Sequence, residues 1–169
     1  VIGDSIATAV QWNPKALALL GRGLDLKMQV AVCRRLTGAS CPYEGAQAPT
    51  LADVVAAQGR ELGPTVVVAV GYNDYEQTFA ASVASSVRAL LAAGVQRILW
   101  VTLRAARQSY PAMNDVVRAA AARYPQVTVV DWDRYSRSHP QWFQNDGIHL
   151  FPPGALAFAS FLRGAVVRA

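Results

Sequence analysis

The sequence predicts an α/β fold, a three-layer α/β/α sandwich built on a five-stranded parallel sheet. Short apolar runs that suit strands alternate along the chain with longer segments that suit helices. The run TVVVAV at 65–70 is typical of a strand covered by helices on both faces, and such strands are joined by right-handed crossovers. No repeat, linker or low-complexity stretch divides the 169 residues, so we expect a single domain over 1–169.

The expected elements have local signals at their ends. The Thr50 hydroxyl can cap a helix by accepting a free N–H of its first turn. Gly94 closes a helix, and Pro111 and Pro153 open two others. Residues 34–49 are expected to form a loop because they contain two glycines and two prolines. We predict strands at 1–2, 24–32, 65–70, 97–103 and 127–132, and helices at 7–20 (interrupted near residue 13), 51–62, 79–93, 111–124 and 154–167.

Composition and charge exclude several classes of protein. Hydrophobic residues make up 53% of the chain and charged residues 16%, which excludes a disordered protein. No apolar run reaches the roughly 18 residues of a membrane-spanning helix. The net charge is +5, but the arginines are scattered and form no basic block, so no nucleic-acid partner is expected. A solvated basic surface is favoured, and attraction to anionic glycans or membrane surfaces stays open.

Cys33 and Cys41 are separated by a polar, loop-like segment, and we expect them to form a disulfide. That bond indicates an oxidising compartment, outside the cell or in its envelope. The alternative is two reduced, partly buried thiols.

Val1-Ile2 looks like the end of a strand that starts upstream, where a signal segment would lie. No Cys/His cluster suggests a metal site; we expect no metal or cofactor, and a monomer.

In a parallel sheet the ligand crevice lies at the carboxyl ends of the strands. Gly3-Asp4-Ser5 directly follows the first strand, and the glycine permits a sharp turn there. A serine at a strand-to-helix turn is exposed, beside a helix N-terminus that favours negative charge. Ser5 is therefore a candidate nucleophile, with Asp4 ordering the turn. The alternative is that Ser5 only caps the helix.

Gly71-Tyr72-Asn73-Asp74 follows the valine-rich strand. An amide N–H of Asn73 aimed into the crevice could stabilise the oxyanion of an acyl-transfer reaction. Gly and Asn also favour turns, so a purely structural role is the alternative.

Asp146-Gly147-Ile148-His149 precedes the last helix. A carboxylate and an imidazole three residues apart can meet when the segment turns, so that Asp146 orients the ring and His149 takes the Ser5 proton. The alternative is a capping aspartate and a surface histidine. The other histidine, His139, has no carboxylate at this spacing.

The order Gly-Asp-Ser, Gly-x-Asn-Asp and Asp-x-x-His resembles the SGNH/GDSL hydrolase family over essentially the whole chain. The resemblance implies a flavodoxin-like sandwich and no metal. It also implies a triad of Ser5, Asp146 and His149, with Asn73 as an oxyanion donor.

The chain departs from the family at one position. The family usually has a glycine after the second strand, whose N–H completes the oxyanion hole together with that of the nucleophile Ser5. Cys33 stands in its place, and its N–H can still donate; Gly38 is the alternative donor.

Tyr72, Arg104 and Tyr110 follow strand ends and are predicted to line the substrate groove, the alternative being ordinary surface.

These residues predict a serine esterase that hydrolyses small acyl esters or acylated carbohydrates through an acyl-enzyme. An acyltransferase that moves the acyl group to or from a sugar hydroxyl would use the same residues and is the alternative. A non-catalytic glycan-binding domain is the third possibility.

Overall fold

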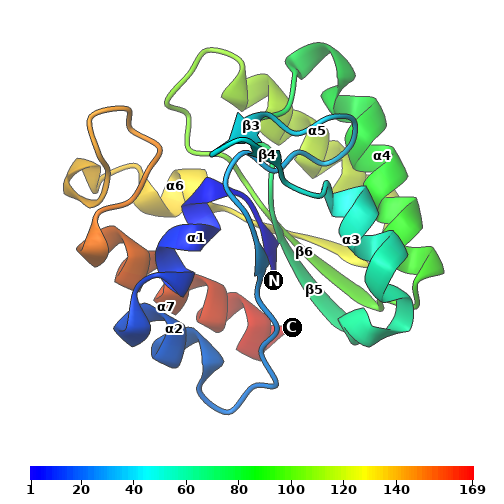
Figure 1. The fold of residues 1–169 in the computed structure, drawn as a ribbon, viewed down its shortest axis with the longest axis horizontal. Coiled ribbons are helices and arrows are strands. Elements are labelled where there is room, and N and C mark those ends of the chain that lie inside the picture. The colour runs from blue at the N-terminus through cyan, green and yellow to red at the C-terminus, as the bar shows by residue number, and fades with distance from the viewer.

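The computed structural model describes residues 1–169 and contains one five-stranded sheet in which all neighbouring strands are parallel (Figure 1). The strands are β1 (Ile2–Gly3), β2 (Gln29–Val30), β5 (Thr65–Ala69), β6 (Arg97–Val101) and β7 (Val127–Val130), in the order β2-β1-β5-β6-β7. This is the flavodoxin-like order, in which ligands bind where the connections diverge, between β1 and β5. The predicted fold class is confirmed.

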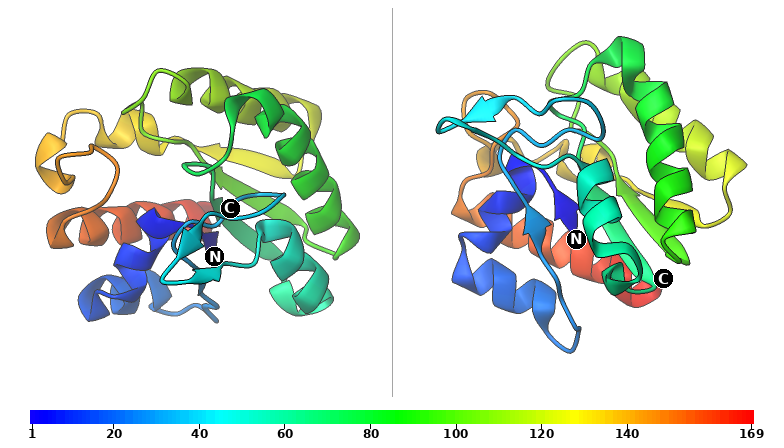
Figure 2. Two further views of the ribbon diagram at one scale, coloured as in Figure 1. Left: turned by 45° about the horizontal axis from the view of Figure 1, so that its top comes forward. Right: turned by 45° about the vertical axis from the view of Figure 1, so that its right-hand side comes forward.

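Helices cover both faces of the sheet (Figure 2). One face carries α1 (Ser5–Gln11), α2 (Pro14–Gly21) and α7 (Pro152–Arg168), and the other carries α3 (Leu51–Gln58), α4 (Glu76–Ala92) and α5 (Tyr110–Arg123). Shorter helical segments are η1 (Gly59–Leu62), α6 (Trp132–Ser136) and η2 (Pro140–Trp142). None of the helices has both the length and the apolar character that crossing a membrane requires.

The structure differs from the sequence prediction in the second strand, in the segment at 34–49 and at the end of the last strand, besides shifts of a few residues at other element ends. β2 has two residues because it pairs only with β1, which is equally short. The expected loop contains a hairpin, β3 (Pro42–Tyr43) and β4 (Ala46–Gln47). Its turn residues Glu44 and Gly45 have φ of 50° and 79°, as tight hairpin turns require. Trp132 begins α6 instead of ending β7, since the Asp131 side chain accepts the Arg134 N–H and caps a new helix.

The first strand-to-helix turn depends on close packing of α1 against the sheet. Gly3 has no positive φ, so it is not required for the turn itself. A Cβ added at Gly3 would overlap the Cβ of Ala7 on α1. Glycine therefore lets the start of α1, and with it Ser5, lie directly against the end of β1.

Candidate active site

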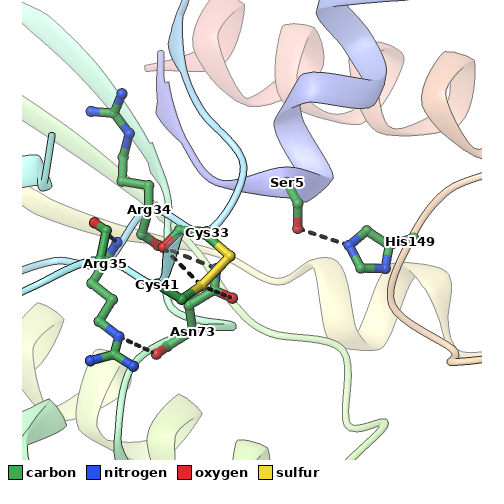
Figure 3. The surroundings of a disulfide bond; sticks show 8 residues. Ser5, Cys33, Arg34, Arg35, Cys41, Asn73 and His149 are labelled. Carbon is green, nitrogen blue, oxygen red and sulfur yellow. Dashed lines mark hydrogen bonds between the residues drawn. A yellow bond between two sulfur atoms is a disulfide. The ribbon is translucent and has the colours of Figure 1, made fainter. Parts of the chain in front are cut away.

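Ser5, His149 and Asp146 form a chain of contacts at the carboxyl end of the sheet. Ser5 is the first residue of α1, and His149 lies in the loop before α7. His149 Nε2 is 3.0 Å from Ser5 Oγ (Figure 3), and His149 Nδ1 is 2.5 Å from Asp146 Oδ2. The structure thus brings together three residues that the sequence analysis singled out. In this order the ring can accept the serine proton and the carboxylate can stabilise the imidazolium.

Hydrogen bonds within the loop and one from Arg104 hold the loop that carries Asp146 and His149. Asp146 Oδ1 accepts the backbone N–H groups of Ile148 and His149. Arg104 Nη1 donates to the Gly147 carbonyl at 2.8 Å, and the Arg104 guanidinium lies over the Phe143 ring. Partial burial raises the pKa of Asp146, but the hydrogen bonds from His149 and Ile148 outweigh it and the pKa falls below its usual value. Asp146 is therefore ionised at neutral pH.

Asp4 ties the nucleophile turn to the end of β5. Its carboxylate is fully buried and accepts the N–H groups of Ile6, Gly71 and Tyr72. These bonds fix the turn that presents Ser5, as the sequence predicts. Burial disfavours the charged form and raises the pKa of Asp4 to about 6, although the backbone hydrogen bonds oppose this.

The raised pKa of Asp4 predicts that stability falls as pH rises from about 4 to about 6. In this window the folded chain holds a proton that the unfolded chain has released, so the free energy of unfolding decreases with pH. The expected decrease from Asp4 is on the order of 2 to 3 kcal/mol. Urea unfolding at pH 4.5 and 7 measures it, and Asp4→Asn, which does not titrate, is expected to lose this part of the slope. An equal slope in both proteins would contradict the assignment.

Asn73 is held beside the segment that follows β2. Its side-chain Nδ2 donates to the Arg34 backbone carbonyl at 3.3 Å, and the Asn73 backbone carbonyl accepts from Arg35 Nε at 2.7 Å (Figure 3). The neighbouring Asp74 carboxylate accepts the Leu36 N–H and so fixes the same two segments together. An amide NH₂ group has two hydrogens, so Asn73 keeps a second donor for a ligand.

Cys33 follows β2 and adopts a backbone conformation that normally needs glycine. Its φ is 65°, in the left-handed region that costs an L-residue about 1 to 2 kcal/mol. Glycine, which has no Cβ, adopts this conformation without that cost. The predicted disulfide between Cys33 and Cys41 is present, and Cys41 Sγ lies 3.9 Å from Asn73 Oδ1 (Figure 3). The disulfide therefore ties the left-handed residue to the hairpin segment beside Asn73.

Comparison with solved structures supports the fold over the whole chain. The C-terminal catalytic domain of Streptococcus pneumoniae peptidoglycan O-acetyltransferase A, solved with a methylsulfonyl adduct, superposes with a TM-score of 0.75. The alignment covers 99% of this chain and 91% of that domain at 20% identity. A Talaromyces cellulolyticus carbohydrate esterase of family 3 aligns over 99% of this chain and 94% of its own, with a TM-score of 0.57 and 14% identity. The chain has the SGNH hydrolase fold.

Sequence comparison relates part of the chain to larger proteins. No family model matches the chain. The putative peptidoglycan O-acetyltransferase YrhL of Bacillus subtilis (strain 168) is 34% identical over 65 residues, which are 38% of this chain and 10% of that protein. O-acetyltransferase OatA of Staphylococcus aureus (strain NCTC 8325 / PS 47) is 33% identical over 69 residues, 41% of this chain and 11% of that protein. The matches thus span about a tenth of these relatives.

The Cys33–Cys41 disulfide predicts the result of a thiol titration. Thiol titration of unfolded, unreduced protein should find no free thiol; two free thiols would contradict the bond. Reduction, or Cys41→Ser, is expected to lower stability by about 2 to 3 kcal/mol, because a short loop is released in the unfolded chain. Urea unfolding with and without reductant measures this change, and Cys41→Ser should no longer respond to reductant.

The residues predicted to line the substrate groove do not line the cavity beside Ser5. Tyr72 and Tyr110 are buried, with 9% and 2% exposure, and their rings pack edge to face. The Tyr72 hydroxyl accepts the Arg104 N–H, and the Tyr110 hydroxyl donates to the Tyr72 carbonyl. The expectation that they line the groove is therefore wrong. Arg104 does not line it either, because its guanidinium holds the Gly147 carbonyl.

A cavity of about 490 Å³ lies beside the Ser5–His149 pair. It is bounded by α1, the start of α2, the hairpin and the start of α7, with Trp12 and Tyr43 among its lining residues. Neither aromatic residue is predicted as a site residue from the sequence. Two signals were present: a tryptophan at the break between two helices, and a tyrosine in a polar loop rich in Gly and Pro.

Proposed function

We propose that the chain is a serine acyltransferase that moves a short acyl group, such as acetyl, onto a carbohydrate hydroxyl. The observation that carries the proposal is the contact chain from Ser5 Oγ through the His149 ring to Asp146, with separations of 3.0 and 2.5 Å. A serine and a histidine without a catalytic role would not require this alignment. The alignment therefore also argues against a non-catalytic glycan-binding domain.

The proposed reaction has two acyl transfers. Ser5 Oγ forms a bond to the carbonyl carbon of an acyl donor while His149 Nε2 takes its proton. The N–H groups of Ser5 and Cys33 and the Asn73 amide bind the oxyanion. The donor's C–O bond breaks, and its alkoxide leaves with the proton held by His149. An incoming sugar hydroxyl then gives its proton to His149 while its oxygen bonds to the acyl carbon. The bond from that carbon to Ser5 Oγ breaks, and His149 returns the proton to Oγ.

We favour transfer to a sugar over hydrolysis, the reaction predicted from the sequence. Two relatives that share about a third of their aligned residues with this chain are named as O-acetyltransferases, and one name specifies peptidoglycan. Hydrolysis is the second candidate, since an acetyl esterase solved with acetate also shares the fold, with a TM-score of 0.59. The two reactions differ only in whether water or a sugar hydroxyl attacks the acyl-enzyme.

The same relatives suggest where the reaction takes place. A peptidoglycan acceptor would place the chain at the cell envelope, and the Cys33–Cys41 disulfide suits an oxidising compartment.

Product analysis tests transfer against hydrolysis. The protein is incubated with p-nitrophenyl acetate, with and without a β-1,4-linked oligosaccharide of N-acetylglucosamine. Mass spectrometry then measures the mass of the oligosaccharide. We expect an acetylated oligosaccharide and faster release of p-nitrophenol when the acceptor is present. If the rate of p-nitrophenol release does not depend on the acceptor and the only acyl product is acetate, the protein is a hydrolase.

A further inference from the structure

The cavity beside Ser5 has exposed aromatic side chains that the proposed proton transfers do not use. Trp12, at the end of α1, is 68% exposed, and Tyr43, on β3, is 45% exposed. Both line the same cavity as Ser5 and His149. Large aromatic side chains left in water next to reactive groups are typical of a ligand surface.

We infer that Trp12 and Tyr43 bind a pyranose ring of the carbohydrate substrate next to Ser5, an inference that rests on the proposed function. The C–H face of a pyranose is apolar and packs against an aromatic ring, whereas its hydroxyls need hydrogen-bonding partners. The cavity supplies both, because Gln144, whose side-chain amide makes no hydrogen bond within the chain, lines it together with the two aromatic residues.

The composition of the cavity favours a sugar over a long acyl chain. A cavity of about 490 Å³ far exceeds the space that an acetyl group fills, so most of it is left for the rest of the substrate. An acyl-chain tunnel needs apolar walls, since unpaired polar groups beside a hydrocarbon are costly. Here the Gln144 amide, which has no hydrogen-bonding partner within the chain, is one of the lining groups.

The disulfide fixes the segment that carries Tyr43. Cys41 lies two residues before Tyr43 and is bonded to Cys33, next to the end of β2. The positive φ values of Glu44 and Gly45 close the hairpin immediately after Tyr43. A tyrosine held by a crosslink and a tight turn loses less freedom on binding than one in an open loop, and this favours affinity.

Calorimetric titration with a β-1,4-linked oligosaccharide of N-acetylglucosamine tests the inference without turnover. The Ser5→Ala protein, which cannot form an acyl-enzyme, is the parent. We expect Trp12→Ala to weaken binding about tenfold and Tyr43→Ala several-fold, while Trp12→Phe, which keeps a ring, retains most of the affinity. Tyr135→Ala is the matched control, because Tyr135 is also 45% exposed but lies on α6 and does not line the cavity. It should bind as the parent does.

Three results would overturn the inference: no binding to the parent, equal affinity in the parent and in Trp12→Ala, or an equal loss in Tyr135→Ala. A change in the chain-length preference of Trp12→Ala toward p-nitrophenyl esters, without a change in sugar affinity, would assign the cavity to the acyl chain instead. Failure of the proposed function is separate, since it appears as p-nitrophenol release that the acceptor does not change or as turnover that does not depend on Ser5.

Discussion

Replacing Ser5 with Ala is expected to lower turnover of p-nitrophenyl acetate by about 10⁴-fold or more. Removing Oγ leaves the acyl group without an acceptor on the protein, and His149 has no proton to take. His149→Ala should cost a similar factor, because the Ser5 hydroxyl 3.0 Å away is then a poor nucleophile. Since the two residues act as one unit, the double variant should be little slower than either single variant.

Steady-state rates with the four proteins of this cycle measure the coupling. His139→Ala is the matched control, because His139 is the other histidine of the chain and its ring stacks on Trp142 instead of contacting Ser5. Its rate should stay near that of the wild type. Additive losses in the Ser5 and His149 variants would contradict a shared role.

Replacing Asp146 with Asn is expected to lower turnover by about 10⁴-fold with little change in the fold. The carbonyl oxygen of Asn can still accept the N–H groups of Ile148 and His149, so the loop keeps its shape. The amide group then faces His149 Nδ1, which must act as the acceptor. The proton therefore sits on Nε2, and the ring can no longer take the proton of Ser5.

The rate and the thermal unfolding midpoint of Asp146→Asn test this explanation together. Asp115→Asn is the control, because Asp115 is an exposed carboxylate on α5 that pairs with Arg118. It should change neither quantity appreciably. A rate for Asp146→Asn within tenfold of the wild type would mean that the carboxylate does not set the tautomer.

The sequence predicts those features that depend on local signals. The valine-rich strand, the helix cap at Thr50 and the polar turn around Ser5 each follow from a few adjacent residues, and the parallel sheet follows from their alternation. The resemblance to the family then predicted which polar turns meet. The contact between Ser5 and His149, 144 positions apart, requires the fold that joins them.

Other features depend on packing that no local pattern shows. Tyr72 and Tyr110 follow strand ends as site residues do, yet their rings pack together and their hydroxyls are used inside the core. Trp12 and Tyr43 lie in unrelated segments, and they line one cavity only because the hairpin and the end of α1 border the same space. The position of a residue after a strand therefore predicts that it lies near the crevice, but it does not predict whether its side chain points into the crevice or into the core.

Labelling with a fluorophosphonate, followed by mass spectrometry of the intact protein and its peptides, tests most directly whether Ser5 is an activated nucleophile. We predict one adduct per chain, located on Ser5, and none in the Ser5→Ala or His149→Ala proteins. An unlabelled wild-type protein, or an adduct on a residue other than Ser5, would contradict this account.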